Sequence, residues 1–299
     1  MLRRTAWRKG LFHARRFDVP VIVVGNITAG GTGKTPLIEM LVRRLQARGL
    51  CPGLVARGYG GRAGSWPQGV HPDSDPALVG DEPVLLVRRT GAPMVVGPDR
   101  PAAVARLLAG HPVDVVLSDD GLQHYRLARD AEIAVVDGER RCGNGHCLPA
   151  GPLREPRSRL ERVDLVLVNG SRTGDEPGFD LVPDDEVVSV QEPGRRQPLD
   201  ALRGRPVHAV AGIGNPARFF ATLRAAGIDV IEHPFPDHHR YRPGDLSFAP
   251  RAPLVMTEKD AVKCTRFGLE DAWYLAVRAR PDESAATAID GLLDRLGLE

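Results

Sequence analysis

Lysine is nearly missing from this chain of 299 residues. Of its 40 basic side chains only four are lysines, and arginine supplies the rest; the four are Lys9, Lys34, Lys259 and Lys263. Together with abundant Ala, Gly and Pro, this bias is typical of a GC-rich genome. A lysine that remains inside a motif is therefore a candidate for a specific chemical role.

Other scarce features exclude whole classes of protein. The four cysteines are too few for a disulfide framework in a chain of this length, so a reducing cytosol is expected. No apolar run reaches the roughly 18–20 residues that span a bilayer, and the N-terminus lacks the apolar core of a signal peptide. The net charge of +2 gives no argument for nucleic-acid binding, and we expect none.

The basic N-terminal segment has two interpretations. In residues 1–16 apolar side chains such as Trp7 and Phe12 are interleaved with arginines, a composition that suits anionic lipid headgroups. This favours a peripheral contact with a membrane surface. The alternative is a solvated helix that covers the first domain.

Buried strands and helices alternate along the first half of the chain. Continuous apolar runs at 19–25, 52–57, 92–97, 113–119, 131–137 and 163–169 are typical of parallel strands covered on both faces. Helical periodicity occurs at 34–49, 82–89 and 100–110. This succession predicts a doubly wound α/β sheet.

The composition changes after Asn169. Residues 171–205 are rich in Gly, Pro, Asp and Glu and show no clear periodicity, which indicates a linker. A smaller α/β unit follows, with strands at 206–212, 229–235, 253–260 and 272–279 and helices at 215–226 and 283–297; strand 272–279 is expected to pair with 186–192. We therefore expect a first domain over 1–170, a linker over 171–205 and a second domain over 206–299.

The segment "GNITAGGTGKT" (25–35) has the order of a phosphate-binding loop: a strand, glycines, then a helix that begins at a lysine. Backbone N–H groups and the positive helix end would hold a polyphosphate, Lys34 would reach its outer phosphates, and Thr35 would ligate Mg²⁺. The usual pattern has a glycine where this chain has Thr28. The strand–loop–helix context still makes the first domain a P-loop-type core, whose nucleotide-binding residues are Thr28, Ala29, Gly30, Gly31, Thr32, Gly33, Lys34 and Thr35.

A pair of acidic residues follows the strand at 113–119. Asp119 and Asp120 stand where doubly wound sheets bind ligands, and adjacent carboxylates repel one another unless a cation is present. Asp81 and Glu82 precede a helix, where Asp81 is explained equally well as an N-cap. The candidate magnesium ligands are Thr35, Asp119, Asp120 and Glu82.

Two further loops carry residues suited to catalysis. In "LPAGPLREP" (148–156) a rigid loop presents Arg154, which fits stabilisation of a transferring phosphoryl group, an anion clamp or only a solvated basic loop. "HPFPDHH" (233–239) concentrates Asp237, His238 and His239, for which proton transfer is as good an interpretation as metal binding. "CGNGHC" (142–147) has too few ligands for a metal site, so its cysteines are interpreted as structural.

Seven motifs in this order closely resemble the tetraacyldisaccharide 4'-kinase family of lipid A biosynthesis. They are "GNITAGGTGKTP", "ARGYGG", "VGDEP", "SDDGLQH", "LPAGPLREP", "FPDHH" and "TEKDAVK", and they span roughly residues 19–265. The family itself carries a small hydroxyl residue at the place of Thr28. It usually has a longer N-terminal amphipathic segment than the roughly eighteen residues here, so weaker anchoring or an upstream start is expected.

The resemblance implies transfer of the ATP γ-phosphoryl group to the 4'-hydroxyl of a tetraacylated glucosamine disaccharide 1-phosphate at the cytoplasmic face of the bacterial inner membrane. Asp81 and His238 would be the acid–base pair, with Asp120 and Arg154 as further catalytic residues. MgATP would be held by the loop and the acidic pair. Because His238 lies in the second domain, closure of the two domains is expected to complete the site.

Two other classes of P-loop protein are alternatives to a kinase. A partition ATPase, which uses ATP to dimerise, carries a signature lysine where this chain has Ala29. A GTPase metallochaperone needs a guanine-reading Asn-Lys-x-Asp motif, which "TEKD" (257–260) imitates poorly. The roles of Lys259 and Asp260 stay open from the sequence.

Overall fold

The computed structural model describes residues 12–299. Most of the N-terminal segment expected to contact a membrane, residues 1–11, lies outside the described part; Phe12 is within it and is exposed. None of the helices in the described part is both long and apolar enough to cross a membrane.

One continuous sheet runs through the molecule, with the order β11-β10-β12-β13-β8-β7-β6-β1-β5-β2-β4-β3, and β9 pairs with β8. Most neighbours are parallel. The strands are β1 (Val21–Gly25), β2 (Pro52–Ala56), β3 (Gln68–Val70), β4 (Met94–Val96), β5 (Val115–Asp119), β6 (Ala131–Asp137), β7 (Leu165–Asn169), β8 (Gly178–Ser189), β9 (Arg196–Pro198), β10 (Pro206–Ala211), β11 (Asp229–Pro234), β12 (Leu254–Thr257) and β13 (Ala272–Pro281).

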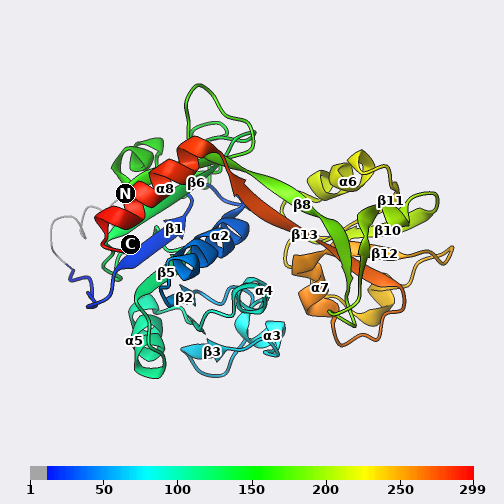
Figure 1. The fold of residues 1–299 in the computed structure, drawn as a ribbon, viewed down its shortest axis with the longest axis horizontal. Coiled ribbons are helices and arrows are strands. Elements are labelled where there is room, and N and C mark those ends of the chain that lie inside the picture. The colour runs from blue at the N-terminus through cyan, green and yellow to red at the C-terminus, as the bar shows by residue number, and fades with distance from the viewer. Residues whose placement is uncertain (1–11) are drawn as a thin grey trace.

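The helices connect these strands. They are α2 (Lys34–Ala47), α3 (Pro76–Val79), α4 (Asp81–Thr90), α5 (Arg100–Gly110), α6 (Pro216–Ala225), α7 (Glu258–Cys264) and α8 (Glu283–Arg295), with short 3₁₀ helices η1 (Arg157–Arg162), η2 (Leu199–Leu202) and η3 (Pro243–Leu246). Figure 1 shows two lobes: β1–β7 with α2–α5 and α8 form the first lobe, and β10–β12 with α6 and α7 form the second.

Each lobe has helices on both faces of its part of the sheet. Alternate residues of β1 point to opposite faces: Ile22 joins a core with α2, α4 and α8, whereas Val23 joins a core with α5. In the second lobe, Ala209 packs with α6 and Val210 with α7. Burial on both faces explains why these strands have continuous apolar sequences, and it confirms the predicted doubly wound α/β architecture.

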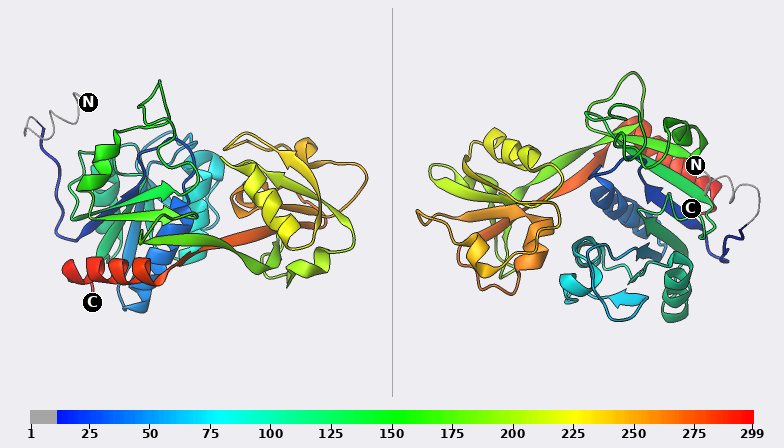
Figure 2. Two further views of the ribbon diagram at one scale, coloured as in Figure 1. Left: turned by 90° about the horizontal axis from the view of Figure 1, so that it is seen from above. Right: turned by 180° about the vertical axis from the view of Figure 1, so that it is seen from behind.

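Strands β8 and β13 join the lobes as a long antiparallel pair, visible in all three views (Figures 1 and 2). Trp273 is opposite Ser189, which confirms the expected pairing of these two segments. The ladder shifts register between Leu275 and Val277, at the point where β13 passes from the second lobe towards the first.

Three sequence expectations differ from the structure. Residues 171–205 are not a plain linker, because they contain β8, β9 and η2. Strand 253–260 ends at Thr257, whose side chain caps α7 by accepting from the N–H of Asp260. Helix α8 packs not on the second lobe but on the first, where Ile289 and Leu292 are buried with α2.

Candidate active site

The phosphate loop lies between β1 and α2, as its sequence predicts. Gly30 and Gly33 have positive φ angles of 94° and 87°, which place the backbone in the left-handed region that side chains disfavour. A Cβ on Gly33 would stand 2.6 Å from the side-chain nitrogen of Asn169 at the end of β7. The eight predicted nucleotide-binding residues therefore form one continuous turn at the start of α2.

Asn26 organises the inside of this loop, a role that the sequence did not reveal. Its buried side chain donates to the carbonyl of Thr28 at 2.9 Å and accepts from Lys34 Nζ at 3.1 Å. Outside the loop, the N–H of Ala29 donates to the carbonyl of Pro152 at 2.8 Å. The loop is thus held from within and against the rigid 147–154 segment, so little ordering is needed when a ligand binds.

Asp120 and Arg154 meet beside the loop. Arg154 Nη1 lies 2.8 Å from Asp120 Oδ2 and 3.0 Å from Asp120 Oδ1, and Lys34 Nζ lies 3.5 Å from Oδ1. Burial alone would raise the pKa of Asp120, but Lys34 and Arg154 hold it below its ordinary value. Asp120 also has a positive φ of 49°, a conformation that few non-glycine residues adopt outside functional sites.

Asp119 differs from its neighbour. It is buried at the end of β5, and one of its carboxylate oxygens has no hydrogen-bond partner among residues 12–299. Burial and the nearby charge of Glu82 raise the pKa of Asp119 to about 7. An orphaned carboxylate of this kind favours a cation, and oxygen ligands suit Mg²⁺.

The four predicted magnesium ligands are not gathered as one cluster. Over residues 12–299 no group of three or more His, Cys, Asp or Glu side chains is placed to hold a metal ion. Asp120 is neutralised by Lys34 and Arg154, and Glu82 by Lys259. Of the three carboxylates, Asp119 alone has no ion-pair partner in the described residues. Asp119 and the neutral Thr35 hydroxyl at the start of α2 are therefore the candidates that fit Mg²⁺, which keeps several waters and needs few protein ligands.

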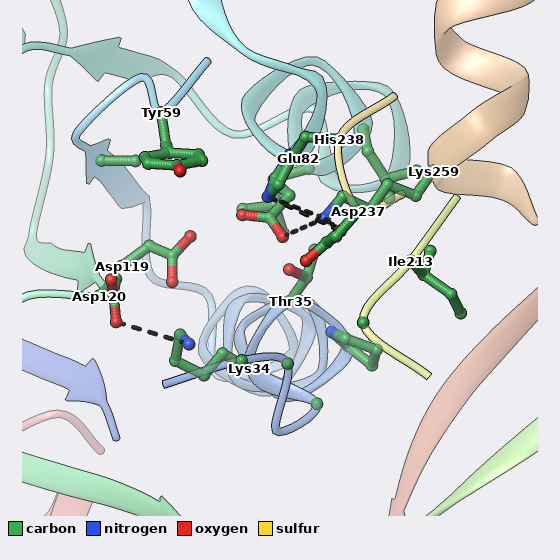
Figure 3. Close-up of a pocket in the computed structure, with 18 of the residues that line it drawn as sticks. Lys34, Thr35, Tyr59, Glu82, Asp119, Asp120, Ile213, Asp237, His238 and Lys259 are labelled. Carbon is green, nitrogen blue, oxygen red and sulfur yellow. Dashed lines mark hydrogen bonds and ion pairs between the residues drawn. The ribbon is translucent and has the colours of Figure 1, made fainter. Parts of the chain in front are cut away.

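Asp81 and His238 come from different lobes and meet. His238 Nδ1 lies 3.2 and 3.3 Å from the two Asp81 oxygens. The centroid of the His238 ring lies 5.0 Å from that of Tyr59, and both of these side chains are labelled in Figure 3. Although burial opposes it, the hydrogen bond with His238 and the charge of Lys259 lower the pKa of Asp81 to about 2. The hydrogen bond with Asp81 raises the pKa of His238. His238 has a positive φ of 59°, so the surrounding contacts hold it in an unfavourable conformation.

Lys259 joins the lobes at the same place. Its ammonium lies 3.0 Å from Glu82 in the first lobe, 3.3 Å from Asp237 and 3.4 Å from His238 Nε2. Figure 3 shows these side chains above Thr35, with Lys34 and the two aspartates to one side. Asp260, the next residue, does not line the site. It is fully buried and accepts a hydrogen bond from the N–H of Gly212 at 2.9 Å.

One cleft of about 850 Å³ lies between the lobes and is lined by Lys34, Thr35, Glu82, Asp119, Asp120, Arg154, His238 and Lys259. Asp81 is not among the lining residues and is linked to the cleft through its contact with His238. A family model described as LpxK, Tetraacyldisaccharide-1-P 4'-kinase, matches residues 1–294. The chain belongs to this family. The kinase named by this family agrees with a cleft that has a phosphate loop at one side and His238, paired with Asp81, at the other.

This chain is similar to curated 4'-kinases and to a solved structure over nearly its whole length. The tetraacyldisaccharide 4'-kinase of Nitrosococcus oceani is 53% identical over 294 residues, 98% of this chain and 86% of that protein. That of Alkalilimnicola ehrlichii is 54% identical over 304 residues, covering 99% and 88%. The "apo" form of LpxK from Aquifex aeolicus, solved in complex with ATP, has 27% identity and a TM-score of 0.80, covering 99% of this chain and 94% of that one.

Proposed function

We propose that this member of the 4'-kinase family transfers the γ-phosphoryl group of ATP to the 4'-hydroxyl of tetraacyldisaccharide 1-phosphate in lipid A biosynthesis. The observation that carries the proposal is the contact between Asp81 and His238, because His238 lines the same cleft as the phosphate loop. ATP binding is supported by the Aquifex relative, whose structure contains ATP. No observation favours the alternative of a P-loop switch or metallochaperone.

The residues divide the reaction between them. The amides of the loop and Lys34 would bind the phosphates of ATP, and Thr35 and Asp119 would hold Mg²⁺, which neutralises phosphate charge when bound. The sugar oxygen forms a bond to the γ-phosphorus while the bond from that phosphorus to the β-phosphate oxygen breaks, and ADP leaves. His238, oriented by Asp81, accepts the hydroxyl proton.

Arg154 and Asp120 would act on the negative charge of the transferring phosphoryl group. Arg154 is held at the cleft by Asp120, and a guanidinium there would stabilise the equatorial oxygens of the transferring group or grip the anionic lipid. Since positioning and electrostatics dominate phosphoryl transfer, their arrangement matters more than the strength of any base.

The acceptor is a lipid, so the protein is proposed to work at the cytoplasmic face of the bacterial inner membrane. Peripheral contact would come from the basic segment over residues 1–16. Removal of these residues should reduce binding to vesicles that contain anionic lipid. Undiminished binding would place the membrane contact elsewhere.

A direct assay tests the function. Purified protein is incubated with γ-labelled ATP, Mg²⁺ and a synthetic tetraacyldisaccharide 1-phosphate, and the lipid fraction is separated by thin-layer chromatography. Label should appear on the lipid and require the free 4'-hydroxyl, so an acceptor with that hydroxyl blocked is the matched control. Label only in inorganic phosphate, or nucleotide-dependent dimerisation without a lipid product, would refute the kinase proposal.

A further inference from the structure

Arg89 occupies a junction of three elements that the reaction scheme leaves unused. It lies in the last turn of α4, and its side chain is 12% exposed. One guanidinium nitrogen donates both to Glu39 on α2 and, at 2.9 Å, to the carbonyl of Val277 on β13. The other donates to Glu258, the first residue of α7 in the second lobe. One planar fork thus ties the phosphate-loop helix, the connecting strand and the second lobe together.

The positions of the three partners show which parts of the site Arg89 connects. Glu39 is on α2, whose first residue is Lys34, and it is almost fully buried. Val277 borders the register shift in β13, where the strand passes between the lobes. Glu258 is followed directly by Lys259, which contacts Glu82 and His238. Arg89 is therefore connected to both ends of the reaction: the phosphate loop through α2 and the Asp–His pair through α7.

Helices α4 and α7 carry complementary charges at this contact. At the start of α4, Glu82 pairs with Lys259; at its end, Arg89 pairs with Glu258. The two pairs have opposite polarity, so a shift of α7 along α4 would bring like charges together, which is unfavourable. This pattern specifies one arrangement of the lobes.

We propose that Arg89, through Glu258, is a positioning residue that fixes the second lobe against the phosphate-loop helix, so that His238 reaches Asp81. The inference rests on the proposed phosphoryl transfer. Arg89, Glu39 and Glu258 also line the cleft, so the division between kcat and the KM for ATP separates positioning from a direct contact with the nucleotide. A misplacement of about 1 Å between reacting groups costs on the order of a hundredfold in rate, so loosening this junction should appear in turnover rather than in nucleotide affinity.

Matched variants separate this role from a general effect on packing. Arg89→Met removes all three contacts, and Glu258→Gln removes only the charge on the second lobe. Arg89→Lys keeps the charge but lacks the fork that reaches two sides. Arg43→Met is the control: Arg43 donates to Glu39 at 2.9 Å and to the carbonyl of Arg89 at 2.8 Å, so it joins α2 to α4, and neither hydrogen bond reaches the second lobe.

The kinetic readout is the division between kcat and KM. Arg89→Met should lower kcat by at least about tenfold with the KM for ATP within about threefold, Arg89→Lys should recover part of the loss, and Arg43→Met should stay near the wild type. Glu258→Gln should share the defect, and the double variant should be no worse than Arg89→Met alone because both remove one interaction. A raised KM with unchanged kcat, or equal losses in Arg43→Met, would overturn the proposal.

A second readout does not depend on turnover. Spin labels are attached through a genetically encoded keto amino acid at Ala109 on α5 and Ala221 on α6, both exposed, and the distance between the lobes is measured by electron–electron resonance. The wild type should give one narrow distribution and Arg89→Met a broader one; identical distributions would overturn the inference. If the wild type makes no phospholipid, the proposed function fails while this measurement still decides the role of Arg89.

Discussion

His124 should make the fold sensitive to acid. It lies in the loop after β5, where its Nε2 accepts from the N–H of Arg100 at 3.4 Å. Burial and the charge of Arg100 lower the pKa of His124 to about 4 from 6.5. The unfolded chain therefore binds this proton near pH 6.5 but the folded chain only near pH 4. The contribution to stability is full above pH 6.5, falls as the pH drops towards 4, and is lost below it.

The magnitude follows from the two pKa values. The pKa of His124 is 6.5 in the unfolded chain and about 4 in the folded protein. At about 1.4 kcal/mol per pH unit, this difference lowers the free energy of unfolding by roughly 2 kcal/mol between pH 7.5 and pH 5. Because the ring is only half buried, solvent screening reduces this to about 1 kcal/mol. His124→Gln keeps an acceptor for Arg100 but does not titrate, so it should lack this loss.

Urea unfolding followed by circular dichroism at pH 7.5 and pH 5 measures the difference. The wild type should lose about 1 kcal/mol more of its unfolding free energy than His124→Gln over this interval. His146→Gln, a change of an exposed histidine in the 142–147 loop, should behave like the wild type. Equal losses in the wild type and His124→Gln would show that the folded protein binds the proton as readily as the unfolded chain.

Three further predictions concern the site and the second lobe. His238→Gln should lower kcat by roughly 10²–10⁴ while ATP affinity, measured by calorimetry, stays within about threefold; near-normal turnover would remove it from proton transfer. Gly33→Ala should abolish ATP binding in a folded protein, because its φ is 87° and Asn169 leaves no room for a Cβ; retained binding would contradict this. Phe220→Ala should cost about 3–5 kcal/mol in urea unfolding, because Phe220 on α6 is fully buried in the core of the second lobe, and a loss below 1 kcal/mol would show that the core there repacks.

The sequence predicted those parts of the fold that depend on local pattern. A strand buried on both faces has a continuous apolar sequence, so β1, β5, β6 and β7 were found within two residues of their ends. The phosphate loop was predictable because its glycines and Lys34 follow one another. The contact between Asp81 and His238 was not visible in the spacing of 157 residues, and it came from the family resemblance.

The structural features that the sequence did not predict depend on partners that are distant in the chain. β8 begins at Gly178 with mixed polar and apolar residues. It forms a strand because it pairs with β13, which lies about a hundred residues further along the chain. Asn26, Asn169 and Arg89 belong to no motif that signals their contacts. The scarcity of lysine did give a usable signal, since two of the three lysines inside motifs, Lys34 and Lys259, lie in the cleft.

The return of α8 to the first lobe has a consequence for biosynthesis. A ribosome completes β1–β7 and then the whole second lobe before it makes the helix whose Ile289, Leu292 and Leu293 cover the first lobe's core. The nucleotide-binding half is therefore finished last, although it is begun first. Until α8 is made and docks, this half exposes an apolar face, so the nascent chain is expected to need protection by a chaperone. A stop codon at residue 283 should leave the first lobe without this cover, whereas the cores of the second lobe contain no residue of α8.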